Sequence, residues 1–201
     1  MTFNVYLQGA DGGAERFGID PARYLRMEIK AVNRAARWAR RVLLIEPMAK
    51  ATGIRKVILG DRIALRVATT TVPAASIVPA SHGIPARCYR HRAEAVDGSG
   101  TRARIVVDWW QGEKIGAGFI NPASKRRLPL ATRSVRERKL KKPARLNPHI
   151  KQYRYEYPVP RDALGPSAAA LMQVVVDDRL HEQVADKVAE EFNLELDKEL
   201  L

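Results

Sequence analysis

The stretch DPARYLRMEIKAVNRAARWARRVLL, residues 20–44, decides the fold. Asp20 is a residue type that caps helix N-termini, and Pro21 suits the first helical turn. Apolar residues then recur at three- and four-residue steps, which predicts one apolar stripe along a long helix: Leu25, Ile29, Val32, Ala36, Ala39 and Leu43. The polar side of this helix is basic, with Arg34, Arg37, Arg40 and Arg41. We expect Pro47 to kink or stop the helix, because proline has no backbone N–H to donate.

A second amphipathic helix is predicted near the end of the chain. Gly165-Pro166-Ser167 is typical of a helix start and precedes a predicted helix over residues 168–176. After it, apolar residues recur at every fourth position with Asp and Glu between them: Leu180, Val184, Val188, Phe192 and Leu196. This pattern predicts a C-terminal amphipathic helix with an acidic outer face.

Between these two helices, most of the sequence favours β-strands. Thr52–Gly53 predicts a helix end, and the apolar residues from Ile54 to Leu65 predict a second helical segment. Strands are expected over residues 3–7, 66–72, 86–93, 101–110, 115–120 and 152–159, with a loop over 79–85 and a hairpin turn at 97–100. The sequence therefore predicts a single α+β domain over residues 1–201, in which a small antiparallel sheet packs against the long N-terminal helix.

Charge is distributed unevenly along the chain. The 201 residues contain 35 Lys and Arg against 22 Asp and Glu, for a net charge of +13. Residues 121–161 carry +11, whereas residues 162–201 carry −7. Such asymmetry indicates either binding of a polyanion by one face or head-to-tail contact between copies. No stretch of the sequence is long and apolar enough to predict a membrane span, so no membrane partner is expected.

Residues 121–151 are predicted to form a long basic loop or arm. Its candidate contact residues are Lys125, Arg126, Arg127, Arg136, Arg138, Lys139, Lys141, Lys142 and Arg145. These side chains would neutralise phosphates without reading bases, or would dock on an acidic protein surface. Both alternatives stay open, although the leucines and prolines within the arm favour docking along a partner.

Motifs for catalysis are not found in the sequence. The P-loop, the zincin pattern and paired Cys-x-x-Cys motifs are absent, and Cys88 is the single cysteine. His82, Cys88 and His91 supply three metal-ligand types where a structural zinc site usually needs four. We therefore expect no catalytic residue, no cofactor and no metal, and a protein that is not an enzyme.

Trp109 and Trp110 are consecutive in the best-predicted strand. Side chains of consecutive strand residues point to opposite faces, so one tryptophan faces away from the core. An interface with another subunit is favoured for this ring over a stacking platform for nucleic acid.

Several short motifs, taken in order, resemble the phage minor tail protein Z family. Ala31-Val32-Asn33-Arg34-Ala35-Ala36 is similar to the Ala-x-Asn-Arg motif of the family's first helix, and Ala51-Thr52-Gly53-Ile54-Arg55 is similar to its following Thr-Gly. The resemblance continues over most of residues 25–200, through Ile84-Pro85-Ala86-Arg87, Arg102 to Asp108, Gly116-Ala117-Gly118-Phe119-Ile120 and Leu164-Gly165-Pro166-Ser167. Two features depart from the family pattern: Pro47 lies where its helix runs on, and residues 121–151 exceed its usual hairpin.

The resemblance implies a structural virion protein of a long-tailed bacteriophage. Family members act as tail completion or neck proteins at the head-proximal end of the tail, beside the tail terminator and head-closure or connector proteins. Tail symmetry implies a homo-oligomeric ring of six copies around the DNA channel, with nonspecific contact to packaged DNA. The implied location is the virion, and the host cytoplasm during assembly. The alternative is a sequence-nonspecific nucleic-acid-binding protein that acts as a free monomer or dimer.

Overall fold

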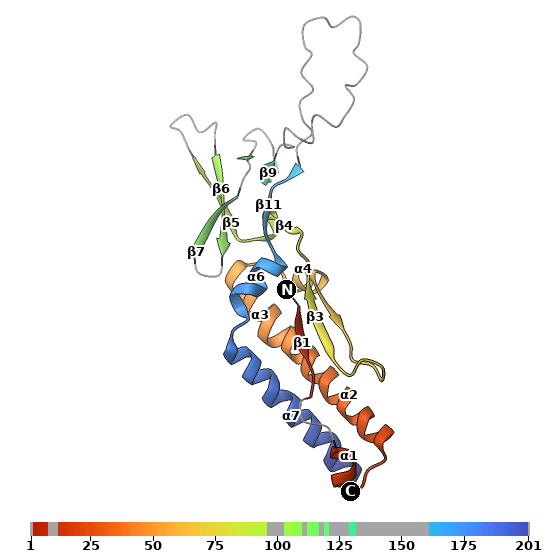
Figure 1. The fold of residues 1–201 in the computed structure, drawn as a ribbon. Coiled ribbons are helices and arrows are strands. Elements are labelled where there is room, and N and C mark those ends of the chain that lie inside the picture. The colour runs from red at the N-terminus through yellow and green to blue at the C-terminus, as the bar shows by residue number, and fades with distance from the viewer. Residues whose placement is uncertain are drawn as a thin grey trace, which may run out of the picture. The chain divides into compact units, whose positions relative to one another are not determined.

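The structure is a computed structural model that describes residues 2–7, 12–95, 103–109, 112–116, 119–120, 129–131 and 161–200. It has the predicted α+β fold, with small antiparallel sheets and a long C-terminal helix (Figure 1). The chain divides into two compact units: Met1–Gly83 with Pro166–Leu201 form the first unit, and Ile84–Gly165 form the second unit. A single domain over residues 1–201 stays a prediction.

The long helix α2, Pro21–Trp38, begins where the sequence predicts. The Asp20 carboxylate accepts a hydrogen bond of 3.0 Å from the backbone N–H of Arg23, and Pro21 lies in the first turn. Helical structure then continues without a gap through the π-helix η1, Ala39–Ile45, and the helix α3, Glu46–Thr52. Pro47 therefore does not stop the helix. The wider π-helical turns precede it and accommodate the missing backbone donor.

The buried face of α2 differs in part from the predicted stripe. Val32, Ala36 and Ala39 are buried as predicted, whereas Leu25, Ile29 and Leu43 are half-buried. The deepest positions toward the helix start are instead Tyr24, Met27 and Ala31, which pack with Phe192 and Leu196. The reason is that α2 has two neighbours, a second helix and a sheet, so its buried face is wider than one stripe.

That second helix is α7, Asp178–Leu200, preceded by α6, Ala168–Val175. All five predicted apolar positions of α7 are buried, which confirms the C-terminal amphipathic helix. The rings of Tyr24 and Phe192 meet edge to face with centroids 5.4 Å apart. The Ser167 hydroxyl caps α6 by accepting a hydrogen bond from the N–H of Ala170, as the predicted start requires.

The sheet of the first unit has the order β1-β3-β2 and is antiparallel throughout. Its strands are β1, Phe3–Val5, β2, Ile63–Arg66, and β3, Ala75–Pro79. Two expectations are wrong here. The helical segment expected to reach Leu65 ends as α4, Lys56–Arg62. The strand expected over 66–72 is β2, which begins at Ile63 and ends at Arg66. Neither β3 nor the short helix α1, Gly13–Phe17, was predicted.

The second unit is built mainly from short strands. The predicted hairpin is confirmed: β5, His91–Ala95, pairs antiparallel with β6, Ala103–Trp109, and β6 with β7, Gly112–Gly116. A further sheet joins β8, Phe119–Ile120, β9, Pro129–Ala131, and β10, Arg161–Asp162. β4, Gly83–Pro85, pairs with β11, Leu164–Ser167, and η2, Ala86–Cys88, is a 3₁₀ turn.

Several predictions for the second unit are only partly correct or fall outside the described residues. The strand expected over residues 86–93 is a 3₁₀ turn followed by β5, and the strand expected over 115–120 is divided between β7 and β8. β9 lies inside the range expected to be an arm. The expected turn at 97–100 and the strand over 152–159 lie outside the described residues.

Candidate interaction surfaces

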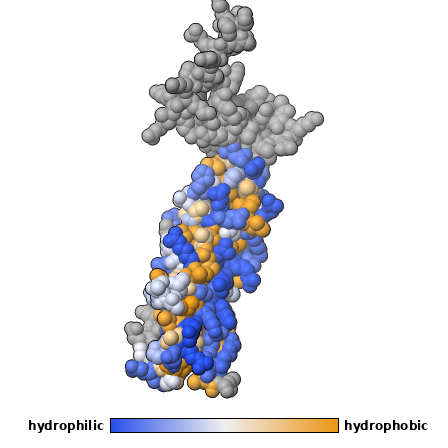
Figure 2. Space-filling model, turned by 90° about the vertical axis from the view of Figure 1, so that its right-hand side faces the viewer, coloured by the Kyte–Doolittle hydropathy of each residue, from blue (hydrophilic) through white to orange (hydrophobic). Residues whose placement is uncertain are grey.

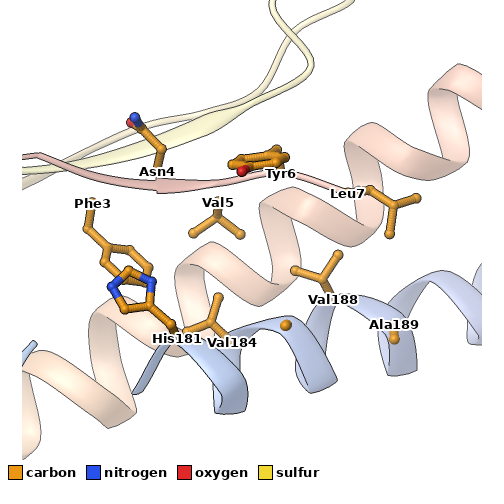
Figure 3. Close-up of a pocket in the computed structure, with 10 residues that line it drawn as sticks. Phe3, Asn4, Val5, Tyr6, Leu7, His181, Val184, Val188 and Ala189 are labelled. Atoms are coloured by element: carbon orange, nitrogen blue, oxygen red, sulfur yellow. The ribbon is translucent and has the colours of Figure 1, made fainter. Parts of the chain in front are cut away.

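A groove lies between β1 and α7 in the first unit (Figure 3). Its volume is about 360 Å³, and its walls are five consecutive residues of the N-terminal segment, Phe3 to Leu7, and five residues of α7: His181, Val184, Ala185, Val188 and Ala189. Phe3, Val5 and Leu7 point toward α7, whereas Asn4 and Tyr6 point away from it (Figure 3).

The groove is mixed in character, because apolar side chains line it together with Asn4, Tyr6 and His181. The His181 ring contacts the Phe3 ring with centroids 4.8 Å apart. The ten lining residues include no carboxylate and no thiol. The lining therefore does not supply a nucleophile paired with a base.

A second concavity, which we call the basic pocket, lies on α2 and η1. It measures about 480 Å³ and is lined by Arg34, Arg37, Trp38, Arg40, Arg41, Ile45 and Glu191. Trp38 and Ile45 are half-buried and buried, respectively, whereas Arg37 and Arg41 are exposed. The pocket thus combines an apolar floor with guanidinium groups at its rim.

Two of the four arginines of the basic pocket are already engaged. Arg40 donates to the carbonyl oxygens of Ile63, at 2.7 Å, and Gly60, at 2.6 Å, and so ties η1 to α4 and β2. Arg34 donates to a Glu195 carboxylate oxygen at 2.6 Å. Arg37 and Arg41 have no hydrogen bond or ion pair to any residue that the structure describes. The charge of Arg41, after Lys56, helps to lower the pKa of Glu46.

Glu195 is the buried carboxylate of the α2–α7 contact. It is 6% exposed and is surrounded by Lys198 at 2.8 Å, Arg34 at 2.6 Å and Lys30 at 3.4 Å. The hydrogen bond from Lys198, with those from Arg34 and Lys30, outweighs burial and lowers the pKa of Glu195 to about 2. Two further carboxylates of α7 face α2 in the same way, Glu191 toward Arg34 and Glu199 toward Arg23. The expected acidic outer face is therefore wrong for these three residues, which point inward to a basic helix.

The predicted site residues fall largely outside the described part of the chain. Lys125, Arg126, Arg127, Arg136, Arg138, Lys139, Lys141, Lys142, Arg145 and Trp110 all lie there. Trp109 is described: it is half-buried on β6, and the Lys114 ammonium lies 4.0 Å from its ring centroid. A subunit interface at Trp109 and Trp110 stays a prediction.

The described residues contain no group of three or more His, Cys, Asp and Glu side chains positioned to hold a metal ion. Cys88 is a free, half-buried thiol, and the Nδ1 atom of His91 lies 2.9 Å from the Tyr89 carbonyl oxygen. None of the helices in the described ranges combines the length and apolar character needed to cross a membrane.

Sequence reasoning placed Arg37 and Arg41 on the polar side of the helix but missed the pocket they line. The usable signal was a pair of like charges four residues apart beside a tryptophan, which is unfavourable on an isolated helix. The β1–α7 groove had no such signal, because it depends on two segments from opposite ends of the sequence.

Comparison with known proteins found no matching family model, no matching curated protein and no matching solved structure.

Proposed function

We propose that this chain is a structural virion protein that completes the head-proximal end of a phage tail. It works without catalysis, as one of six copies in a ring at the head–tail neck around the DNA channel. Its partners are its own copies, the tail terminator and the head-closure or connector proteins, with nonspecific contact to packaged DNA. Its place is the virion, after assembly in the host cytoplasm.

The observation that carries this proposal is the role of the Asn33–Arg34 motif. The Asn33 side-chain amide donates to the carbonyl oxygen of Ala68 at 3.1 Å and accepts from the N–H of Ala68 at 2.7 Å. Arg34, the next residue, pairs with Glu195 on α7. Asn33 and Arg34 thus connect α2 to the segment after β2 and to α7, which supports a structural role for this motif.

Other motifs that resemble those of the family also bind to the chain's own backbone. The Thr52 hydroxyl donates to the Met48 carbonyl at 2.7 Å and accepts from the Ile54 N–H at 3.3 Å. Gly53 ends α3 with φ of 74°, in the left-handed region that glycine adopts readily. Side chains committed to caps and crosslinks support a structural role for the pattern as a whole.

The surface of the first unit supports assembly with other macromolecules. Hydrophobic residues are interspersed among hydrophilic ones along the face drawn in Figure 2. The β1–α7 groove and the basic pocket are two separate concave surfaces on this unit. Different surfaces of this kind are what a subunit needs to contact several neighbours in a ring.

Charge reversal of Arg126, Arg127, Lys141 and Lys142 to Glu tests the proposal in the phage that encodes the chain. We expect a folded subunit, judged by circular dichroism, and loss of joined, infectious particles. Reversal of Arg16 and Arg26, which are exposed and outside both concave surfaces, is the control. Normal particle yield from the quadruple variant would refute the role of the arm.

A second measurement addresses the oligomer and the alternative function. The purified chain is sized by sedimentation with and without neighbouring tail proteins, and its affinity for duplex DNA is measured over a range of salt concentrations. A free monomer or dimer that ignores the tail proteins yet binds duplex with steep salt dependence would replace the neck proposal with nucleic-acid binding.

A further inference from the structure

The outer face of α7 carries a ridge of exposed residues that we call the acidic ridge: Asp186, Glu190, Leu194 and Asp197. The first three are spaced four residues apart, and Asp197 follows Leu194 by three, so all four are neighbours on the helix surface. Leu194 is 45% exposed. It is a large apolar side chain between two carboxylates.

The acidic ridge cannot turn inward within its own chain. The opposite face of α7 is already packed on α2 through Phe192 and Leu196. Asp186 and Asp197 have no ion pair with any described residue. Glu190 pairs with Lys187 at 2.8 Å, but Lys187 also holds Glu191 at 3.0 Å and so remains neutralised if Glu190 turns to another cation.

The basic pocket has the complementary composition. Its apolar floor, Trp38 and Ile45, matches the apolar character of Leu194. The guanidinium groups of Arg37 and Arg41, which have no ion pair within the described part of the chain, match the flanking carboxylates. Arg37 and Arg41 are four residues apart, as are Asp186 and Glu190, so each surface holds like charges that repel on its own helix. Contact between the two surfaces would relieve both repulsions.

We propose that the acidic ridge of one copy binds in the basic pocket of a second copy. The partner is this same chain, and the inference rests on the ring assembly of the proposed function. The two surfaces are different, so the contact is head-to-tail: every copy offers one pocket and one ridge. Repetition of such a contact closes a ring when the rotation per copy permits it.

The test uses the full chain and two double variants. The pocket variant carries Arg37→Glu and Arg41→Glu, and the ridge variant carries Glu190→Arg and Asp197→Arg. Sedimentation velocity measures self-association of each, and circular dichroism confirms that each is folded. We expect each variant to raise the dissociation constant of self-association by at least ~10-fold. The matched control, Arg16→Glu with Arg26→Glu, makes the same charge change as the pocket variant and is expected to associate normally.

Mixing the variants gives the sharpest outcome. The pocket variant keeps an intact ridge and the ridge variant keeps an intact pocket, and the reversed pocket of one is complementary in charge to the reversed ridge of the other. Their mixture should therefore regain the association that each variant lacks alone. A chain that carries all four reversals should regain self-association, because its charges are exchanged between the two surfaces. Leu194→Ala should weaken association without any change of charge.

Three results would overturn the proposal. The first is a wild-type chain that stays monomeric at all concentrations, and the second is self-association unaffected by the reversals. The third is unchanged association combined with loss of salt-dependent binding to a 20-base-pair duplex in the pocket variant, which would make the pocket a nucleic-acid site. Particle assays separate this inference from the proposed function: normal particles from the pocket variant refute the inference alone.

Discussion

Replacement of Glu195 by Gln should destabilise the fold at neutral pH and leave it nearly unaffected in strong acid. The cations around this carboxylate lower its pKa from 4.5 to about 2. At ~1.36 kcal/mol for each pKa unit, this difference corresponds to at most ~3 kcal/mol of stability. Arg34, Lys30 and Lys198 are between 43% and 61% exposed, so solvent screens their attraction. We therefore expect a loss of ~1–2 kcal/mol at pH 7.

The pH dependence follows from the sign of the pKa change. A carboxylate whose pKa is lower in the folded state stabilises fully above its unfolded value, here 4.5, and this contribution disappears as the pH falls through the folded value of about 2. Urea denaturation followed by far-ultraviolet circular dichroism at pH 7, 4 and 2.5 measures it. The difference between wild type and Glu195→Gln should shrink along this series.

The matched control is Glu182→Gln, because Glu182 is exposed on the same helix and has no ion pair with a described residue. It should change stability by less than ~0.5 kcal/mol at every pH. Equal effects of the two substitutions at pH 7, or a Glu195→Gln deficit that persists undiminished at pH 2.5, would refute the account of the buried network.

Four further substitutions test the packing and the hydrogen bonds of the fold. Phe192→Ala should cost ~3–5 kcal/mol in urea denaturation, because it empties the contact with Tyr24 in the α2–α7 core; an unchanged midpoint would mean that α7 is not docked there. Gly165→Ala should lower the melting temperature, because a Cβ atom there would lie 2.7 Å from the Tyr89 ring. Its control, Gly60→Ala, should raise the melting temperature slightly, because the residue is inside a helix and the atom nearest to its Cβ would be 3.7 Å away. Asn33→Leu should cost ~1–3 kcal/mol by leaving a backbone N–H and carbonyl unpaired, and hydrogen exchange at Ala68 should accelerate if those bonds are the cause.

Much of the helical framework could be predicted from the sequence because its signals are local. The signals are the cap at Asp20, the helix end at Gly53 and the apolar residues at every fourth position of α7. Each signal lies within a few residues of the feature that it determines. Leu25 and Ile29 were predicted to be buried because a single apolar stripe assumes one packing partner, whereas α2 packs against both a helix and a sheet. Which face of a helix is buried depends on what packs on it.

The strands of the first unit were harder to predict. β3 lies between β1 and β2, but its sequence ends in Pro79 and lacks the alternating polar residues of a half-exposed strand. The β-branched run Thr69-Thr70-Thr71-Val72 resembles a strand locally, yet its Thr69 hydroxyl accepts from the Val72 N–H and forms a turn. Local propensity loses there to a side-chain hydrogen bond.

The same dependence on tertiary contact changes what the charges can do. The sequence suggests the acidic C-terminal helix as the counterpart of the basic arm. In the structure, cations of α2 pair with three carboxylates of α7: Glu191, Glu195 and Glu199. The charges of these carboxylates are therefore largely neutralised within the chain. What remains for intermolecular contact is the outer face of α7, including the acidic ridge. If this ridge binds the pocket of a neighbouring copy, the arm must find its anions elsewhere, in other neck proteins or in DNA. Salt should then weaken ring formation and arm binding independently, and the two charge-reversal experiments should be additive.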